Sequence, residues 1–295
     1  MTRIAIVGGG RAATLHAEAA MATPGVELVG VGGRPGTAGP LAEAARVPDL
    51  SLSDLAARAD GIVVAVTPDA TAGIVALLPA GLPLLVETPV RVTETRASAM
   101  TAVNLLHAAT VKQGLRAIAD LGPVHHLALR GRAVRRTFAT DVFAEPFAGV
   151  WPVALMAAGT PAASVGATLD GSDATVRVTL DDGRVVVATL GWSAADPAEH
   201  AADAFTELEA AGASGVVNIG LWPLPTLEID GRPVASAAQH PLVALGFVEQ
   251  MRRFAAVCDG RGSVWPPLAV GIGIDALTRA AARSAAADGA ETMVW

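Results

Sequence analysis

The sequence predicts an α/β protein in two parts, an N-terminal doubly wound parallel sheet and a C-terminal α+β domain with an open, mostly antiparallel sheet. The N-terminal part alternates short aliphatic runs with alanine-rich segments of helical length, as expected for parallel strands joined by helices. From about Gly122, candidate strands follow one another with only turns between them. The 295 residues, 52% of them hydrophobic, suffice for two cores.

In the N-terminal part, near-continuous β-branched and aliphatic runs indicate strands that are covered on both faces. The expected strands are Arg3–Val7, Val26–Gly32, Gly61–Val66 and Leu82–Val86. The expected helices are Ala12–Met21, Leu41–Arg46 and Ala70–Leu78. Single helices between strands imply right-handed crossovers and a parallel sheet.

In the C-terminal part, Asp181-Asp182-Gly183 and Asp230-Gly231 predict tight turns between strands. The expected strands are His126–Arg130, Ala163–Leu169, Thr175–Leu180, Arg184–Leu190, Ala204–Ala210, Gly215–Ile219 and Thr226–Ile229. Two closing helices are expected at about Val243–Val257 and Leu268–Ala287. The boundary falls between 105 and 122, so we predict domains at 1–118 and 119–295.

Composition excludes several classes of protein. A net charge of −7 without a basic cluster argues against nucleic acid or an anionic membrane surface as a partner. The single cysteine, Cys258, excludes an internal disulfide and a multi-cysteine metal site, and no metal-ligand spacing is present.

The charge-free stretch Pro146–Leu169 is interrupted by proline and glycine, which favours buried core over a membrane span. The N-terminus lacks the apolar length of a signal peptide, so we expect a cytoplasmic protein.

The composition also limits which side chains can act as general acids or bases. The chain has no tyrosine, and Lys112 is its only lysine. Histidines and carboxylates are therefore the remaining candidates for proton transfer.

A glycine-rich loop follows the first strand. Gly8, Gly10 and Ala13 fit the pattern G-x-G-x-x-G/A, with a strand before and a helix after. The first glycine permits a tight turn, the second lets a pyrophosphate approach the backbone, and the helix N-terminus attracts the anion. We therefore predict a dinucleotide site that includes Arg11 and Ala12.

The end of the second strand favours NADP(H) over NAD(H). An acidic residue there would bind the ribose 2′-hydroxyl of NAD. The chain instead has Gly33-Arg34, which leaves room and positive charge for a 2′-phosphate. The alternative is that Arg34 is an ordinary exposed loop residue.

The chain resembles the Gfo/Idh/MocA family, the glucose-fructose oxidoreductase and inositol dehydrogenase group, over nearly its whole length. The motifs that carry the resemblance are Gly8-x-Gly10-x-x-Ala13-x-x-His16, Thr67-Pro68-Asp69, Glu87-Thr88-Pro89 after Leu84-Leu85-Val86, Phe247-Val248-Glu249-Gln250-Met251 with Phe254, and Ser284-Ala285 with Gly289. The resemblance implies a Rossmann domain, an open-faced sheet that forms homodimers or larger homo-oligomers, and hydride transfer between NAD(P) and a small molecule. It also implies that Thr67, Pro68 and Glu87 lie at the cofactor.

The chain departs from that family where protons are handled. Thr88 replaces the lysine of the family's Glu-Lys-Pro motif, and Gly149-Val150 stands where the family has a His-Asp pair. Both changes are similar to the biliverdin-reductase-like branch, as is Phe147-Ala148-Gly149-Val150. The alternative is convergence among members that have lost the sugar-oxidising residues. Members of that branch can deliver hydride to an electron-poor conjugated substrate, with the proton supplied by water or an arginine.

The candidate catalytic residues are Glu87, Thr88 and His107. Glu87 could contact the nicotinamide carboxamide or hold its loop, and His107 could face a cleft or be a half-exposed helix residue. His16 is expected to be a packing residue. The candidate substrate residues are Glu145 and Trp151, with Arg132, Arg135 and Arg136 as possible carboxylate ligands. Trp151 as plain core and the arginines as solvated residues are the alternatives.

These observations predict an NADP(H)-dependent oxidoreductase, more specifically a reductase of a small carbonyl, imine or conjugated compound. The alternative is a dinucleotide-binding sensor or regulator of the same fold without turnover. This alternative is based on the absence of both the family's lysine and its His-Asp pair.

Overall fold

The computed structural model describes residues 1–34, 36–92, 95–134, 142–143, 147–193, 204–236 and 240–294. The chain forms two compact units. The first contains Met1–Asn104 and Gly246–Ile272, and the second contains Leu105–Leu245 and Gly273–Trp295. The division is not a single cut in the sequence, because residues 246–272 return to the first unit.

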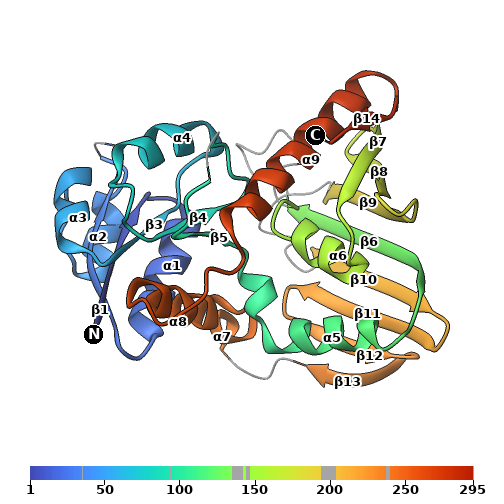
Figure 1. The fold of residues 1–295 in the computed structure, drawn as a ribbon, viewed down its shortest axis with the longest axis horizontal. Coiled ribbons are helices and arrows are strands. Elements are labelled where there is room, and N and C mark those ends of the chain that lie inside the picture. Colours follow the sequence, from blue (N-terminus) through green and yellow to red (C-terminus); the bar gives the residue numbers. More distant parts are fainter. Residues whose placement is uncertain are drawn as a thin grey trace. The chain divides into compact units, whose positions relative to one another are not determined.

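The first unit is built on a five-stranded parallel sheet with the order β2-β1-β3-β4-β5 (Figure 1). Its strands are β1 (Thr2–Val7), β2 (Val26–Gly32), β3 (Gly61–Val64), β4 (Leu84–Glu87) and β5 (Ala99–Ala102). Its helices are α1 (Arg11–Ala22), α2 (Gly39–Ala45), α3 (Leu52–Arg58), α4 (Pro68–Leu77) and α8 (Phe247–Cys258). Ile4, Ala5 and Ile6 of β1 are fully buried, so side chains of both faces lie in the core. The predicted doubly wound parallel sheet is confirmed.

The second unit contains a nine-stranded sheet with the order β13-β12-β11-β10-β6-β9-β8-β7-β14 (Figure 1). Its strands are β6 (Val124–Val134), β7 (Ala162–Asp170), β8 (Asp173–Leu180), β9 (Val185–Ser193), β10 (Phe205–Gly212), β11 (Gly215–Trp222), β12 (Thr226–Ile229), β13 (Arg232–Ser236) and β14 (Thr292–Met293). Only the β6–β9 pair among these neighbours is parallel. The predicted mostly antiparallel sheet is confirmed.

One face of this second sheet is apolar and covered. The strand register aligns a row of residues on it, namely Leu227, Ile219, Leu208, Leu129, Ala188, Val176 and Ala167, and each is at most 2% exposed. Helix α5 (Ala109–Ala119) packs here, with Gly114 directly against Ile219 and Leu227. The other face is exposed at Thr175 and Arg177, as period-2 alternation predicts for a sheet covered on one side.

The remaining helices correct one expectation. The helix expected at Val243–Val257 is two helices, α7 (Pro241–Ala244) and α8, because Gly246 adopts a φ of +84° between them. The described part of the charge-free stretch, residues 147–169, contains α6 (Trp151–Ala158) and all of β7 but its last residue. The last helix is α9 (Leu268–Ala286), and the turn η1 (Asn104–His107) precedes α5. Among the described residues, no helix is both long and apolar enough to cross a membrane.

Candidate dinucleotide site

Gly8 is required for close packing of the glycine loop. Its φ is +139°, and a Cβ built on it would lie 2.0 Å from the carbonyl oxygen of Ala65, just after β3. The Gly8 N–H donates to the carbonyl of Gly32 at the end of β2, at 2.8 Å. Ala13, which is fully buried, lies under the same turn. The loop is therefore held by the ends of both strands that flank β1.

Gly10 has the opposite environment. It is the N-cap of α1, and a Cβ built on it would meet no heavy atom within 4 Å. No side chain caps this helix and no acidic residue lies in its first turn. The start of α1 therefore has open space beside the Gly10 Cα and a favourable helix dipole, and this arrangement fits a pyrophosphate. Arg11 is exposed and Ala12 is half-buried at the same helix start.

The turn after β2 packs against the glycine loop. A Cβ built on Gly9 would lie 1.9 Å from the carbonyl oxygen of Thr37. The Thr37 hydroxyl donates to the carbonyl of Arg34 at 2.7 Å, which closes this turn. Gly33 and Arg34 are exposed beside the loop. Within the described part of the chain, no hydrogen bond or ion pair holds the Arg34 guanidinium.

Sequence reasoning missed a carboxylate in this region. Asp49 forms a parallel bridge with Val31 of β2, and its Oδ2 atom lies 3.8 Å from a Cβ built on Gly39 in α2. Asp49 is exposed. It is not part of β2 in the sequence, so a search for an acidic residue at the end of that strand could not find it.

Thr67 and Pro68 stand at the start of α4, and two residues separate them from the end of β3. Thr67 is the exposed N-cap of this helix and makes no capping hydrogen bond through its side chain. Asp69 of the first turn pairs with Arg91. These residues therefore lie near the carboxyl end of β3, the edge where open α/β sheets bind ligands.

Glu87 ends β4 at the same edge, and its partner was not predicted. His16 Nε2 of α1 lies 2.6 Å from Glu87 Oε1. The His16 side chain is fully buried and packs edge-on against Phe247 of α8, with a ring-centroid distance of 5.7 Å. The Glu87 side chain is 22% exposed. Packing is thus only part of the role of His16, because it also anchors Glu87.

The other candidate catalytic residues are divided between the two units. Thr88 follows Glu87 in the first unit and is half-buried. His107 belongs to the second unit and is 3% exposed in the turn η1, so its interpretation as a half-exposed helix residue is wrong. Trp151, also in the second unit, is 1% exposed at the start of α6, in agreement with the plain-core alternative.

Of the candidate substrate residues, Glu145, Arg135 and Arg136 lie outside the described residues. Arg132 is exposed, in agreement with the solvated alternative, and it also pairs with Asp173 of β8 at 3.3 Å. Within the described ranges, no group of three or more His, Cys, Asp or Glu side chains is arranged to hold a metal ion.

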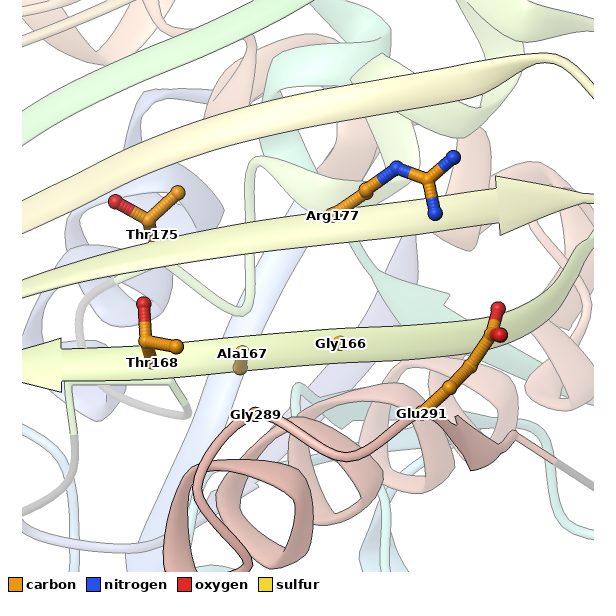
Figure 2. Close-up of a pocket in the computed structure, with 7 residues that line it drawn as sticks. All are labelled: Gly166, Ala167, Thr168, Thr175, Arg177, Gly289 and Glu291. Carbon is orange, nitrogen blue, oxygen red and sulfur yellow. The ribbon is translucent and has the colours of Figure 1, made fainter.

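A shallow pocket of about 250 Å³ lies elsewhere, in the second unit (Figure 2). It is lined by Gly166, Ala167, Thr168, Thr175, Arg177, Gly289 and Glu291. Hydrogen bonds from Ser164 and Thr179 hold the pKa of Glu291 below its usual value. None of the lining residues was a predicted site residue.

Comparison with known proteins agrees with the motifs. Residues 2–114 match the Gfo/Idh/MocA model, described as an oxidoreductase family with an NAD-binding Rossmann fold. This match confirms the resemblance for the N-terminal segment. No match is found among curated proteins.

Solved structures extend the similarity of fold to the whole chain. GenD2 from gentamicin A biosynthesis, in complex with NAD, is 22% identical with a TM-score of 0.80, over 99% of this chain and 96% of its own. A putative myo-inositol dehydrogenase from Sinorhizobium meliloti 1021 is 17% identical with a TM-score of 0.79, and both chains are covered completely. The apo scyllo-inositol dehydrogenase from Lactobacillus casei is 15% identical with a TM-score of 0.80, over 100% of this chain and 98% of its own.

Proposed function

We propose that this chain is an NADP(H)-dependent oxidoreductase that reduces a small carbonyl, imine or conjugated compound. The observation that carries the proposal is the start of α1, where a Cβ on Gly10 would meet no heavy atom within 4 Å and no side chain caps the helix. The match of residues 2–114 to an NAD-binding oxidoreductase family supports the same class of cofactor and reaction.

The proposed preference for NADP(H) rests on Arg34. This exposed guanidinium lies on the turn that packs against the glycine loop, and it has no side-chain partner in the described part of the chain. A guanidinium is suited to a phosphate because it offers paired donors. Asp49 would favour the 2′-hydroxyl of NAD, so the preference depends on which side chain reaches the ribose.

The protein's part in the reaction is binding and orientation. When bound, the nicotinamide supplies the hydride. The N–H groups at the start of α1 would bind the pyrophosphate, and Glu87 and Thr88 would orient the groups at the carboxyl edge of β4. Thr88 can donate or accept a hydrogen bond, but it cannot replace a lysine as a general acid or base at neutral pH. We therefore favour an electron-poor substrate that takes its proton from water or an arginine, with positioning as the main contribution to rate.

A second candidate is a dinucleotide-binding sensor or regulator without turnover. Thr88 supports it, together with Gly149 and Val150 at the positions of the family's His-Asp pair. A protein that binds the cofactor to report its concentration needs the glycine loop but no proton donor.

Fluorescence titration with NADPH and NADH separates these possibilities. We expect NADPH to bind more tightly and to be oxidised by at least one member of a panel of carbonyl, imine and bilin compounds. Binding without turnover over a broad panel would favour the sensor. Failure to bind either nucleotide would overturn both functions.

A further inference from the structure

The binding of a pyrophosphate by the backbone of the glycine loop does not explain why His16 is present. It is on the second turn of α1, fully buried, and its Nε2 lies 2.6 Å from Glu87 Oε1. Helix α1 follows β1, and the sheet order places β3 between β1 and β4, so this hydrogen bond joins the helix after one strand to the end of a strand that is not its neighbour. The imidazole therefore ties the helix of the glycine loop to the end of a distant strand.

The chemistry of the two groups fixes the direction of this hydrogen bond. An ionised carboxylate only accepts, so Nε2 carries the proton and donates it to Oε1. His16 Nδ1 is buried and has no hydrogen-bond partner among the described residues. A second proton on Nδ1 would leave a buried N–H unpaired in a charged ring, which is costly. The geometry thus favours the neutral ring protonated on Nε2.

Glu87 keeps one oxygen available. Its side chain is 22% exposed, and within the described residues His16 is its only side-chain partner. A carboxylate held by a single donor at one oxygen has its second oxygen, Oε2, fixed in orientation but free to accept. Fixing it in advance lowers the entropy that binding must remove.

We propose that His16 is a positioning residue for Glu87, which it holds so that Oε2 accepts a hydrogen bond from the carboxamide N–H₂ of a bound nicotinamide. This role rests on the proposed function. Phe247 supports it, because its edge contact with the His16 ring keeps the imidazole in place from α8. Because 71 residues separate His16 from Glu87, no local sequence motif predicts their hydrogen bond.

Two substitutions of His16 test the donor directly. His16→Gln keeps an N–H donor near the position of Nε2, whereas His16→Met has similar bulk and no donor. We expect His16→Met to weaken NADPH binding about tenfold or more, and His16→Gln by less than about threefold, in fluorescence titrations. The exposed pair His126–Glu209, at 3.2 Å on the second sheet, offers a matched control. His126→Met should leave NADPH affinity unchanged.

A double-mutant cycle separates positioning from a merely structural role. If His16 acts through Glu87, then His16→Met combined with Glu87→Gln should bind NADPH no more weakly than Glu87→Gln alone. Independent, multiplying losses would contradict the proposal. So would equal affinities for wild type, His16→Met and His16→Gln.

A spectroscopic measurement covers the case in which His16→Met fails to fold. In ¹⁵N spectra of the histidine rings, wild-type His16 should show the neutral tautomer protonated on Nε2, and Glu87→Gln should shift that signal. A His16 ring protonated on Nδ1, or one insensitive to Glu87→Gln, would overturn the inference. A wild type that binds no dinucleotide overturns the proposed function and this role with it. Wild-type binding that His16→Met leaves intact overturns the role alone.

Discussion

His16 Nε2 and Glu87 Oε1 lie 2.6 Å apart and join the helix of the glycine loop to the carboxyl end of β4. Because Phe247 of α8 packs on the same imidazole, the position of Glu87 also depends on a helix from the C-terminal part of the sequence. Residues 246–272 belong to the first unit, so two segments far apart in the sequence complete its candidate site.

The glycine loop allows folding and binding to be separated. Gly8→Ala should destabilise the fold by about 2 kcal/mol or more, because its Cβ would lie 2.0 Å from the Ala65 oxygen at a φ of +139°. Gly10→Ala should fold normally, because its Cβ meets no heavy atom within 4 Å. It should still weaken NADPH binding about tenfold, since the Cβ fills the space proposed for the pyrophosphate. Urea unfolding and fluorescence titration measure the two effects, and undiminished binding by Gly10→Ala would remove the site from this loop.

Cofactor preference should depend on two opposed charges. Arg34→Ala should weaken NADPH binding about tenfold and leave NADH binding nearly unchanged, because it removes a charge-assisted contact to the 2′-phosphate. Asp49→Asn tests the opposite charge, because a loss of NADH affinity in this variant would place Asp49 at the ribose. Arg58→Ala, an exposed arginine at the end of α3 in the same unit, is the control. Equal losses of both nucleotides in Arg34→Ala would contradict the assignment of the 2′-phosphate.

The packing of α8 on the first sheet gives a prediction about stability. A Cβ on Gly61 would lie 2.3 Å from Cys258 Sγ and 2.9 Å from Phe254 Cζ. Gly61→Ala should therefore lower the free energy of unfolding by about 1–3 kcal/mol. Cys258→Ala removes the nearer obstacle, so the double variant should be more stable than the sum of the two single effects. If the changes in unfolding free energy of the two single variants add strictly in the double variant, helix α8 shifts to accommodate the new Cβ and does not clash with it.

Sequence patterns predicted the bounds of strands best where aliphatic residues adjoin turn residues, as at Gly25 and at Asp230-Gly231. Val26–Gly32 and Thr226–Ile229 have the predicted bounds. Strand β5, with the sequence AMTA, was missed because it has neither length nor alternation. Its burial comes from distant residues, such as Pro266, whose carbonyl accepts from the Thr101 N–H at 2.9 Å.

The candidate site was predictable only in part. The roles of Gly8 and Gly10 follow from a local motif, since strand, turn and helix are consecutive. The hydrogen bond between His16 and Glu87 depends on how α1 lies over the sheet, and Asp49 reaches β2 through a bridge to Val31. Such contacts join residues far apart in the sequence, and one sequence carries no signal for them.

The thiol of Cys258 should make stability depend on alkaline pH. Burial is the main cause that raises its pKa from 9.0 to about 12. The folded state disfavours the thiolate, so this contribution to stability is fully present below pH 9 and is lost as pH rises from about 9 to about 12. Urea unfolding of wild type and Cys258→Ala should show a smaller decline for the variant over this interval. Parallel declines would mean that other groups cause the loss.

The open face of the second sheet should mediate self-association, which we propose from the exposed apolar side chains on it. Val187 of β9 is 40% exposed and lies between Ala128 of β6 and Arg177 of β8 in the strand register. The same face carries the cross-strand ion pairs Arg130–Glu207 and Arg132–Asp173, both at 3.3 Å. A two-fold interface joins the same patch of both copies, and a face that carries charges of both signs beside an apolar residue suits it.

Val187→Glu should therefore convert a dimer or larger oligomer to monomer, because it places an unpaired carboxylate at the centre of the interface. Leu77→Glu is the matched control, since Leu77 is 73% exposed on α4 of the first unit and lies on no part of this face. Sedimentation equilibrium of wild type and both variants measures the effect. A monomeric wild type, or a Val187→Glu variant that associates as wild type does, would show that this face does not join copies of the chain.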